Sequence, residues 1–213
     1  MKIVPAILTD NLETFKKQLL QAETFSDEVD IDVLNNTLVK EKTLPLLDML
    51  EVETTLVRHL HLMTENPSED IKLALDYGIK SVVVHAKADL EWINFDELPL
   101  KVGVSLSPET AVDVIGIHLN TLSLVQLMTV VPGEQGGQFR KDVLKKADEL
   151  RTLGFKGEIK ADGGVKDTNI SDLEAAGIDS VSVGSYIWKS KDPKEAYKKL
   201  QEIVQSNEVY SKG

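Results

Sequence analysis

Short β-type runs alternate with amphipathic stretches along the whole chain, and this alternation constrains the fold more than any other feature. Parallel strands need a long crossover connection, so strict alternation predicts a parallel sheet with helices between its strands. In a chain of 213 residues, eight such strands favour a closed TIM (β/α)8 barrel over an open doubly wound sheet. The expected strands are Lys2–Leu8, Glu28–Val33, Glu53–Leu62, Ser81–His85, Lys101–Ser105, Leu122–Val130, Gly157–Ala161 and Ser180–Val183.

Helical patterns fall between these runs. Glycines such as Gly78, Gly154 and Gly177 follow several of them, as is usual beyond a helix C-terminus. Ser107 and Pro108 have the residue types of a helix cap and a first helical position. No linker or shift in composition divides residues 1–213, so we expect a single barrel domain. The expected helices are Asn11–Ala22, Glu41–Leu50, Ser68–Tyr77, Pro108–Ile115, Gly137–Leu153, Thr168–Ala176 and Pro193–Gln205, with a weaker candidate at Leu90–Phe95.

Charge and composition exclude several classes of function. The net charge of −11 opposes binding to nucleic acid or to an anionic membrane. There is no cysteine, which excludes disulfides, thiolate zinc sites and cysteine nucleophiles. No apolar run has the length of a signal peptide core or of a membrane span, so we expect a cytoplasmic protein. A small phosphorylated ligand remains possible, because backbone N–H groups can bind phosphate.

Acidic and imidazole side chains gather where the expected strands end, which is where the active site of such a barrel lies. Asp30 and Asp32 share one face of their strand, because side chains alternate along it. Together with His61 and Asp162 they have the ligand types of a metal site. A single aspartate would more often be a helix cap, but four such residues at strand ends favour a functional site. His85 is expected to be a buried neutral histidine without a catalytic role.

Three glycine-rich loops follow expected strands: Met128–Phe139, D-G-G at 162–164 and V-G-S at 183–185. Each alone is explained by ordinary turns. Three together favour a phosphate site, because backbone amides of such loops can surround phosphate oxygens and the loops after strands 7 and 8 often do so in TIM barrels.

At this point the chain resembles the ribulose-phosphate 3-epimerase family over nearly its whole length. The resemblance is carried by H-L-M-T-E-N-P at 61–67, M-T-V-V-P-G at 128–133, A-D-G-G-V at 161–165, V-G-S at 183–185 and P-A-I-L-T at 5–9. It implies a ribulose-phosphate-binding TIM barrel and an isomerase that inverts C3 of a ketose phosphate through a 2,3-enediolate. It also implies a role in pentose phosphate metabolism, a divalent cation, a small phosphorylated sugar as partner and a homo-oligomer of two or more subunits.

Roles carry over by position. The resemblance implies Asp32 and Asp162 as the two acid/base residues, with His61 as a metal ligand beside them. We expect Asp30, Asp32, His61 and Asp162 around the cation. The pocket would be lined by Ala6, Met63, Met128 and Lys160, and the phosphate would lie against Gly133, Glu134, Gln135, Gly136, Gly163, Gly164, Gly184 and Ser185.

The chain departs from the family pattern in and around this site. Asp30 stands where the family has its first metal histidine, and Ala6 stands where it has serine. The stretch after the second strand reads L-N-N-T-L-V-K-E from Leu34 instead of M-D-G-x-F-V-P-N, and Gly137 replaces a glutamine. Three carboxylates and a divalent ion sum to a charge of −1, which suggests Mn²⁺ or Mg²⁺ rather than Zn²⁺.

Lys160 is the residue that could change this charge balance. It lies two positions before Asp162, on the same strand face, where the family usually has an acid. An ammonium beneath the acids could replace part of the metal's charge, whereas a different strand register would leave it in solvent. Two alternatives to the epimerase therefore stay open: a metal-free sugar-phosphate lyase or decarboxylase that uses aspartate and Lys160, and a non-catalytic barrel that binds a sugar phosphate.

Overall fold

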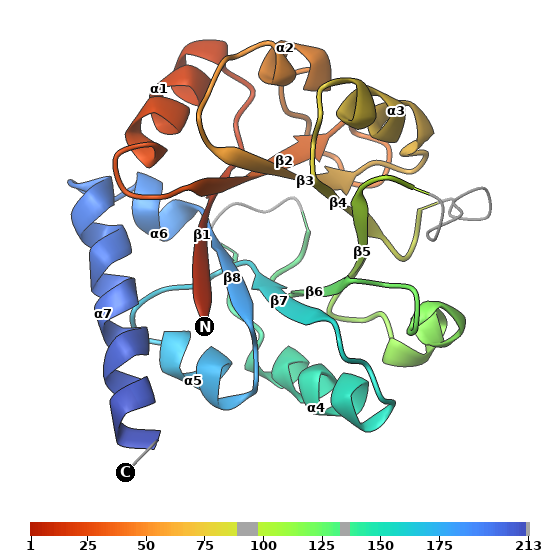
Figure 1. The fold of residues 1–213 in the computed structure, drawn as a ribbon, viewed down its shortest axis with the longest axis vertical. Coiled ribbons are helices and arrows are strands. Elements are labelled where there is room, and N and C mark those ends of the chain that lie inside the picture. Colours follow the sequence, from red (N-terminus) through yellow and green to blue (C-terminus); the bar gives the residue numbers. More distant parts are fainter. Residues whose placement is uncertain (89–97, 133–136, 212–213) are drawn as a thin grey trace.

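Eight parallel strands close into a barrel in sequence order, with the helices around its outside (Figure 1). The computed structural model describes residues 1–88, 98–132 and 137–211. This architecture confirms the predicted (β/α)8 barrel. The strands are β1 (Lys2–Ile7), β2 (Glu28–Leu34), β3 (Val57–Met63), β4 (Ser81–His85), β5 (Lys101–Leu106), β6 (Leu124–Met128), β7 (Glu158–Asp162) and β8 (Ser180–Val183).

The helices connect successive strands, and the Asn11 side chain caps the first of them by accepting a hydrogen bond from the Thr14 N–H. The expected helix at Leu90–Phe95 lies outside the described residues. In the part of the chain that is described, no helix combines the length and apolar character needed to cross a membrane. The α-helices are α1 (Leu12–Ala22), α2 (Leu46–Leu50), α3 (Ser68–Asp76), α4 (Lys145–Thr152), α5 (Ile170–Ala175), α6 (Ser185–Trp188) and α7 (Pro193–Ser211), and the 3₁₀ segments are η1 (Val112–His118) and η2 (Lys141–Leu144).

The predicted helix Glu41–Leu50 was wrong in its first half, since only α2 is helical. The Thr43 N–H donates to the Leu34 carbonyl at 2.9 Å, and the Leu34 N–H donates to the Thr43 hydroxyl at 3.1 Å. These bonds extend the end of β2 and hold residues 41–43 beside it. A helix can begin only after this pairing ends, at Pro45.

The predicted helix Pro108–Ile115 was also wrong, because a turn precedes the 3₁₀ segment η1. The buried ammonium group of Lys146 donates to the carbonyls of Ser107, Pro108 and Thr110 at 2.8–2.9 Å. Because these three carbonyls point to one cation, residues 107–110 form a turn and not the first turn of a helix. The pattern at Gly137–Leu153 likewise becomes η2 followed by α4, and the short helix α6 was not predicted.

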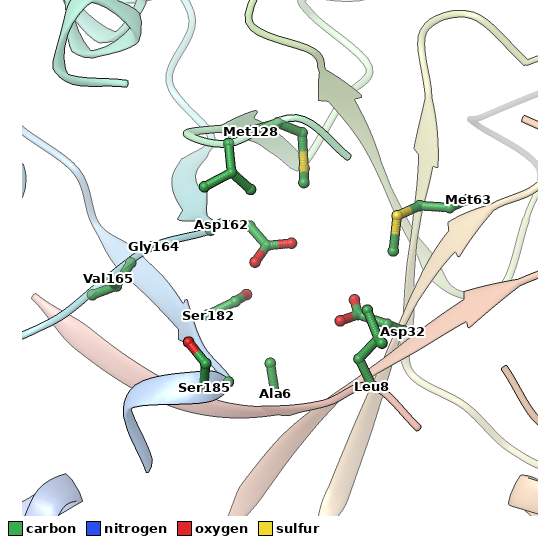
Figure 2. A pocket seen from close by; sticks show the side chains of 13 residues that line it. Ala6, Leu8, Asp32, Met63, Met128, Asp162, Gly164, Val165, Ser182 and Ser185 are labelled. Carbon is green, nitrogen blue, oxygen red and sulfur yellow. The ribbon is translucent and has the colours of Figure 1, made fainter. Parts of the chain in front are cut away.

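Strand register brings the chemistry-bearing side chains to one end of the barrel. Asp32 pairs with His61 between β2 and β3, and Asp162 pairs with Met128 and Ser182 on the strands beside it. Neighbours in a parallel pair point to the same side of the sheet. Side chains from β2, β7 and β8 therefore converge at the carboxyl ends of the strands, as Figure 2 shows for Asp32, Asp162 and Ser182.

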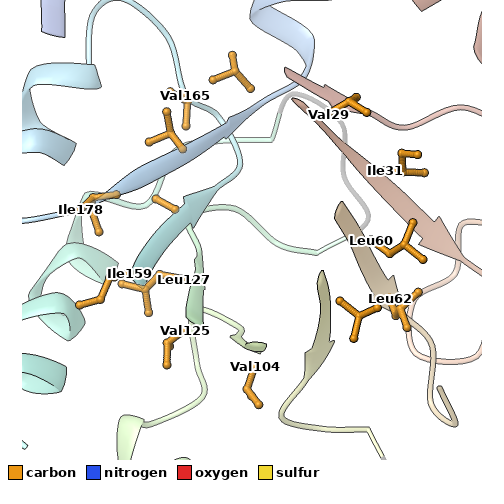
Figure 3. Packing of buried hydrophobic residues seen from close by; sticks show 14 of the residues in the cluster. Val29, Ile31, Leu60, Leu62, Val104, Val125, Leu127, Ile159, Val165 and Ile178 are labelled. Atoms are coloured by element: carbon orange, nitrogen blue, oxygen red, sulfur yellow. The ribbon is translucent and has the colours of Figure 1, made fainter. Parts of the chain in front are cut away.

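The main apolar core lies on the outer side of the barrel, under the helices. Outward-facing strand residues such as Ile31, Leu62 and Val125 form it together with the buried faces of the helices (Figure 3). The inside of a TIM barrel is usually filled by branched apolar side chains. Here it also holds buried polar groups: Asp30, Asp32, His61, His85, Ser105, Gln126, Lys160, Ser180 and Ser182.

The outer core predicts a contrast within helix α1. Phe15 is fully buried there, whereas Leu20 is 68% exposed. Phe15→Ala should lower the free energy of unfolding by roughly 3–5 kcal/mol, and Leu20→Ala should change it by less than about 0.5 kcal/mol. Urea denaturation of both variants measures this difference. Equal losses would contradict the assignment of the core.

Candidate active site

A pocket opens at the carboxyl ends of the strands (Figure 2). Residues from β1, β2, β3, β6, β7 and β8 surround it, so it collects side chains from both halves of the sequence. Nine of the predicted site residues line it: Ala6, Asp32, Met63, Met128, Asp162, Gly163, Gly164, Gly184 and Ser185. Leu8, Val130, Val165 and Ser182 complete the lining.

Asp32, His61 and Asp162 form a compact group at this pocket, here called the acid–histidine group. His61 Nδ1 lies 3.0 Å from Asp32 Oδ1 and 3.2 Å from Asp162 Oδ2. One ligand atom from each residue lies within 4.8 Å of those of the other two. Two carboxylates and one imidazole are a donor set that suits a divalent cation, so these three residues could hold a metal ion.

Burial and mutual interaction shift the protonation of this group. Burial raises the pKa of Asp32 to about 6; the charge of Asp162 acts in the same direction, and the hydrogen bond from His61 opposes it. Burial alone would lower the pKa of His61, but hydrogen bonds to Asp162 and Asp32 outweigh burial and raise that pKa to about 9. In the metal-free protein the imidazolium of His61 is therefore the cation that holds the two acids together.

Asp162 is held in place by Gln126 on β6 and by Thr129, which directly follows this strand. Gln126 Nε2 donates to Asp162 Oδ2 at 3.1 Å. The Thr129 N–H donates to the Asp162 carbonyl at 2.7 Å, and the Thr129 hydroxyl donates to the Gly163 carbonyl at 2.6 Å. Gly163 follows with φ of +110°, and a Cβ there would lie 2.3 Å from Val130 Cγ2. Only glycine fits this turn, which explains the D-G-G sequence physically.

The glycine loops after β7 and β8 face the same pocket. Gly163 and Gly164 line it from one loop, and Gly184 and Ser185 line it from the other. Asn169 Nδ2 donates to the Gly164 carbonyl at 2.9 Å, which ties the first loop to the N-terminal end of α5. The expected phosphate-binding residues Gly133, Glu134, Gln135 and Gly136 lie outside the described residues.

The structure does not bring Asp30 into the acid–histidine group. Its carboxylate accepts hydrogen bonds from Lys160 Nζ at 2.6 Å and from the Ser182 hydroxyl at 2.5 Å, inside the barrel. Lys160 is buried in the barrel rather than exposed to solvent, which decides between the two placements considered from the sequence. It is not among the residues that line the pocket. Asp30 and Lys160 thus neutralise each other, and the two remaining aspartates would balance the charge of a divalent ion without the excess negative charge expected from three.

His85 lies on the far side of His61 from the two acids. Its Nε2 atom is 2.9 Å from His61 Nε2, and the two rings meet edge to edge, with centroids 5.0 Å apart and planes that differ by 15°. Burial lowers the pKa of His85 well below its ordinary value, and the charge of His61 acts in the same direction. His85 is therefore neutral, as expected from the sequence, but it contacts the site directly.

Sequence reasoning missed several residues that build the site. Gln126 and Ser182 contact the acids across neighbouring strands, and no motif marks them. Thr129 lies in the M-T-V-V-P-G stretch, but that motif gives it no role. The inward position of Gln126 and Ser182 could have been inferred from alternation along β6 and β8. Their partners depend on the strand register, which the sequence pattern does not specify.

Comparison with known proteins decides the family. The model of the ribulose-phosphate 3-epimerase family matches residues 2–188. The chain belongs to this family. It is 31% identical over 218 residues to a ribulose-phosphate 3-epimerase of Helicobacter pylori, covering 97% of this chain and 99% of that protein. A ribulose-phosphate 3-epimerase of Bacillus subtilis is also 31% identical, over 94% of this chain and 98% of its own length.

Solved structures support the fold alone, since their sequences are distant. KGPDC from Streptococcus mutans in complex with D-R5P aligns with a TM-score of 0.68 at 16% identity, over 96% of this chain and 97% of that chain. The 3-hexulose-6-phosphate synthase from Salmonella typhimurium aligns with a TM-score of 0.67 at 17% identity, over 97% and 99%. The epimerase family barrel thus shares its architecture with enzymes of other names.

The raised pKa of His61 predicts how stability depends on pH. A histidine whose pKa rises on folding stabilises the fold below about pH 6.5, and this stabilisation is lost as the pH rises through about 9. In metal-free protein, the free energy of unfolding should fall by roughly 1–3 kcal/mol over this range. His61→Gln should lack this decline. Urea denaturation with a chelator present measures both proteins, and equal slopes would argue against the imidazolium.

The Asp30–Lys160 ion pair predicts that replacing Lys160 destabilises the protein far more than replacing an exposed lysine does. Lys160→Met leaves a buried carboxylate without its cation and should cost roughly 3–5 kcal/mol of stability. Adding Asp30→Asn should recover more than half of that loss, because the unpaired charge is then gone. Lys166→Met, at an exposed position, is the control and should be near neutral. Thermal and urea unfolding of the four proteins test this, and a harmless Lys160→Met would refute the pairing.

Proposed function

We propose that the protein is an epimerase of a ketose phosphate, most simply one that interconverts ribulose 5-phosphate and xylulose 5-phosphate. The acid–histidine group carries this proposal. Two carboxylates from β2 and β7 face one pocket with His61 between them, and glycine loops line the pocket beside them. Membership of the ribulose-phosphate 3-epimerase family gives this geometry its chemical meaning.

Two aspartates suit inversion at a carbon next to a carbonyl. One carboxylate removes the C3 proton from one face of the substrate, and the other carboxylic acid delivers a proton to the opposite face. Asp32 and Asp162 are proposed for these roles. A carboxyl with a pKa near 6 accepts and returns a proton near neutral pH more readily than an ordinary aspartate does. Met63 and Met128 line the same pocket with apolar side chains that limit water around the reacting carbon.

We propose that Asp32, His61 and Asp162 hold a divalent cation, with His61 binding through Nδ1. The cation supplies a positive charge that stabilises the oxygens of an enediolate. Because the Asp30 charge is balanced by Lys160, the donor set itself does not favour one of Mn²⁺, Mg²⁺ and Zn²⁺ by charge. Binding must displace a proton from His61, so cation affinity should increase with pH.

The phosphate is proposed to lie against Gly163, Gly164, Gly184 and Ser185. Gly163 and Gly164, both with positive φ, form the turn after β7 and line the pocket together with Gly184 and Ser185. The glycine loop after β6, with Gly133, Glu134, Gln135 and Gly136, is proposed to contribute as well. Binding through backbone amides is consistent with an acidic protein.

The lyase alternative would need the Lys160 ammonium at the substrate. That ammonium is bound by Asp30 beneath the pocket, and this contact argues against the alternative. A cytoplasmic location and a homo-oligomer of two or more subunits remain predictions from the sequence.

Proton exchange at C3 is the test. Metal-reconstituted protein is incubated with ribulose 5-phosphate in D₂O, and C3 is followed by NMR. We expect deuterium to enter at C3 while xylulose 5-phosphate forms. Asp32→Asn and Asp162→Asn should each lower the rate of inversion by at least about a thousandfold, because each removes one essential proton carrier.

Asp76→Asn, at an exposed position on α3, is the control and should keep wild-type activity. Elemental analysis of the purified protein identifies the cation independently. Absence of exchange with Mn²⁺, Mg²⁺ and Zn²⁺ would reject this substrate and favour a non-catalytic barrel.

A further inference from the structure

His85 contacts the acid–histidine group without lining its pocket. It ends β4 and is 1% exposed. Its Nε2 atom lies 2.9 Å from His61 Nε2, and the planes of the two rings differ by only 15°. A buried imidazole placed edge to edge with another needs a defined donor and a defined acceptor, because two N–H groups or two lone pairs would repel.

The chemistry of His61 assigns these roles. Its Nδ1 atom faces Asp32 and Asp162, so Nδ1 is the atom proposed to bind the cation. A neutral histidine that binds a cation through Nδ1 must carry its proton on Nε2. Gln126 Nε2 lies 3.2 Å from the same atom, but it is an amide donor that also donates to Asp162. The His61 N–H therefore donates to His85 Nε2, which must offer a lone pair. His85 consequently carries its own proton on Nδ1.

We propose that His85 is a positioning residue, which accepts the hydrogen bond from His61 and so aims His61 Nδ1 between Asp32 and Asp162. An imidazole can rotate about its Cβ–Cγ bond, and the two carboxylates alone constrain only one of its edges. His85 constrains the opposite edge through the hydrogen bond. Partners of this kind fix the tautomer and orientation of metal-binding histidines. The inference rests on the proposed function, since the atom positioned is the one assigned to the cation.

The surroundings of His85 determine which variants are informative. On its other side His85 lines a cavity of about 410 Å³ that also includes Leu38, Ser107 and Val131. Truncation to alanine would enlarge this cavity and remove hydrogen bond and packing together. Two larger replacements separate the two contributions. His85→Phe keeps a ring that fills the space but has no acceptor, and His85→Gln keeps an acceptor oxygen but has no ring.

Cation affinity is measured by calorimetry with Mn²⁺ on chelator-treated protein, followed by steady-state kinetics. His85→Phe should weaken Mn²⁺ binding by about 10- to 100-fold and should lower kcat more than it changes KM for the sugar phosphate. His85→Gln should stay within about threefold of the wild type in affinity, because it still accepts the His61 N–H. His118→Gln, at the end of η1, is the control and should leave both properties unchanged.

The opposite order would overturn the proposal. If His85→Phe binds Mn²⁺ like the wild type while His85→Gln does not, His85 acts through packing; if both bind like the wild type, it has no positioning role. A third outcome separates the two proposals. If Mn²⁺ binds more weakly to His85→Phe than to His85→Gln, as expected, but no variant and no wild-type protein epimerises the sugar phosphate, the proposed function is rejected and the positioning role stands.

A measurement on the wild-type protein tests the proposal even if the variants fail to fold or the protein does not bind Mn²⁺. The chain has four histidines, so ¹⁵N-histidine labelling gives a simple NMR spectrum. Metal-free protein should show His85 neutral, with Nδ1 protonated and Nε2 bare. A proton on His85 Nε2 would contradict the assignment of donor and acceptor.

Discussion

Charged side chains inside the barrel must neutralise one another, and the site depends on how they do so. A buried carboxylate is costly without a partner. Asp30 is balanced by Lys160 and Ser182, whereas Asp32 and Asp162 share His61. The two arrangements are adjacent, since Asp30 and Asp32 lie on β2 and Lys160 and Asp162 lie on β7. One is closed and structural, and the other keeps its oxygens at a pocket where a cation and a substrate can reach them.

The fold tolerates these buried charges because its main apolar core lies outside the barrel. Residues such as Ile31 and Leu62 pack outward beneath the helices, so polar groups can occupy the barrel interior without removing the principal source of stability. The interior polar groups also order one another: Gln126 supports Asp162, and His85 contacts His61. The acids are consequently held on strands, while the glycine loops line the pocket beside them.

Much of this could be predicted from the sequence because it depends on local pattern. Alternation of strand and helix predicts the barrel, and residues at or just after the carboxyl ends of strands, such as Asp32, Asp162 and the glycines of D-G-G, are found at the pocket. What the sequence could not predict depends on contacts between strands. Lys160 next to Asp30 is decided by register and shear around the closed barrel. The turn at Ser107–Thr110 exists because Lys146, 36–39 residues later, collects its carbonyls.

The central claim is that two separate acids act on opposite faces of C3. A single turnover in H₂O with ribulose 5-phosphate deuterated at C3 tests it most directly, with the xylulose 5-phosphate formed analysed by mass spectrometry. If one aspartate removes the deuteron and the other delivers a proton from solvent, the product should have lost nearly all its deuterium. Product that retains deuterium at C3 would mean that one group carries the hydrogen between faces, and it would contradict the two-aspartate account.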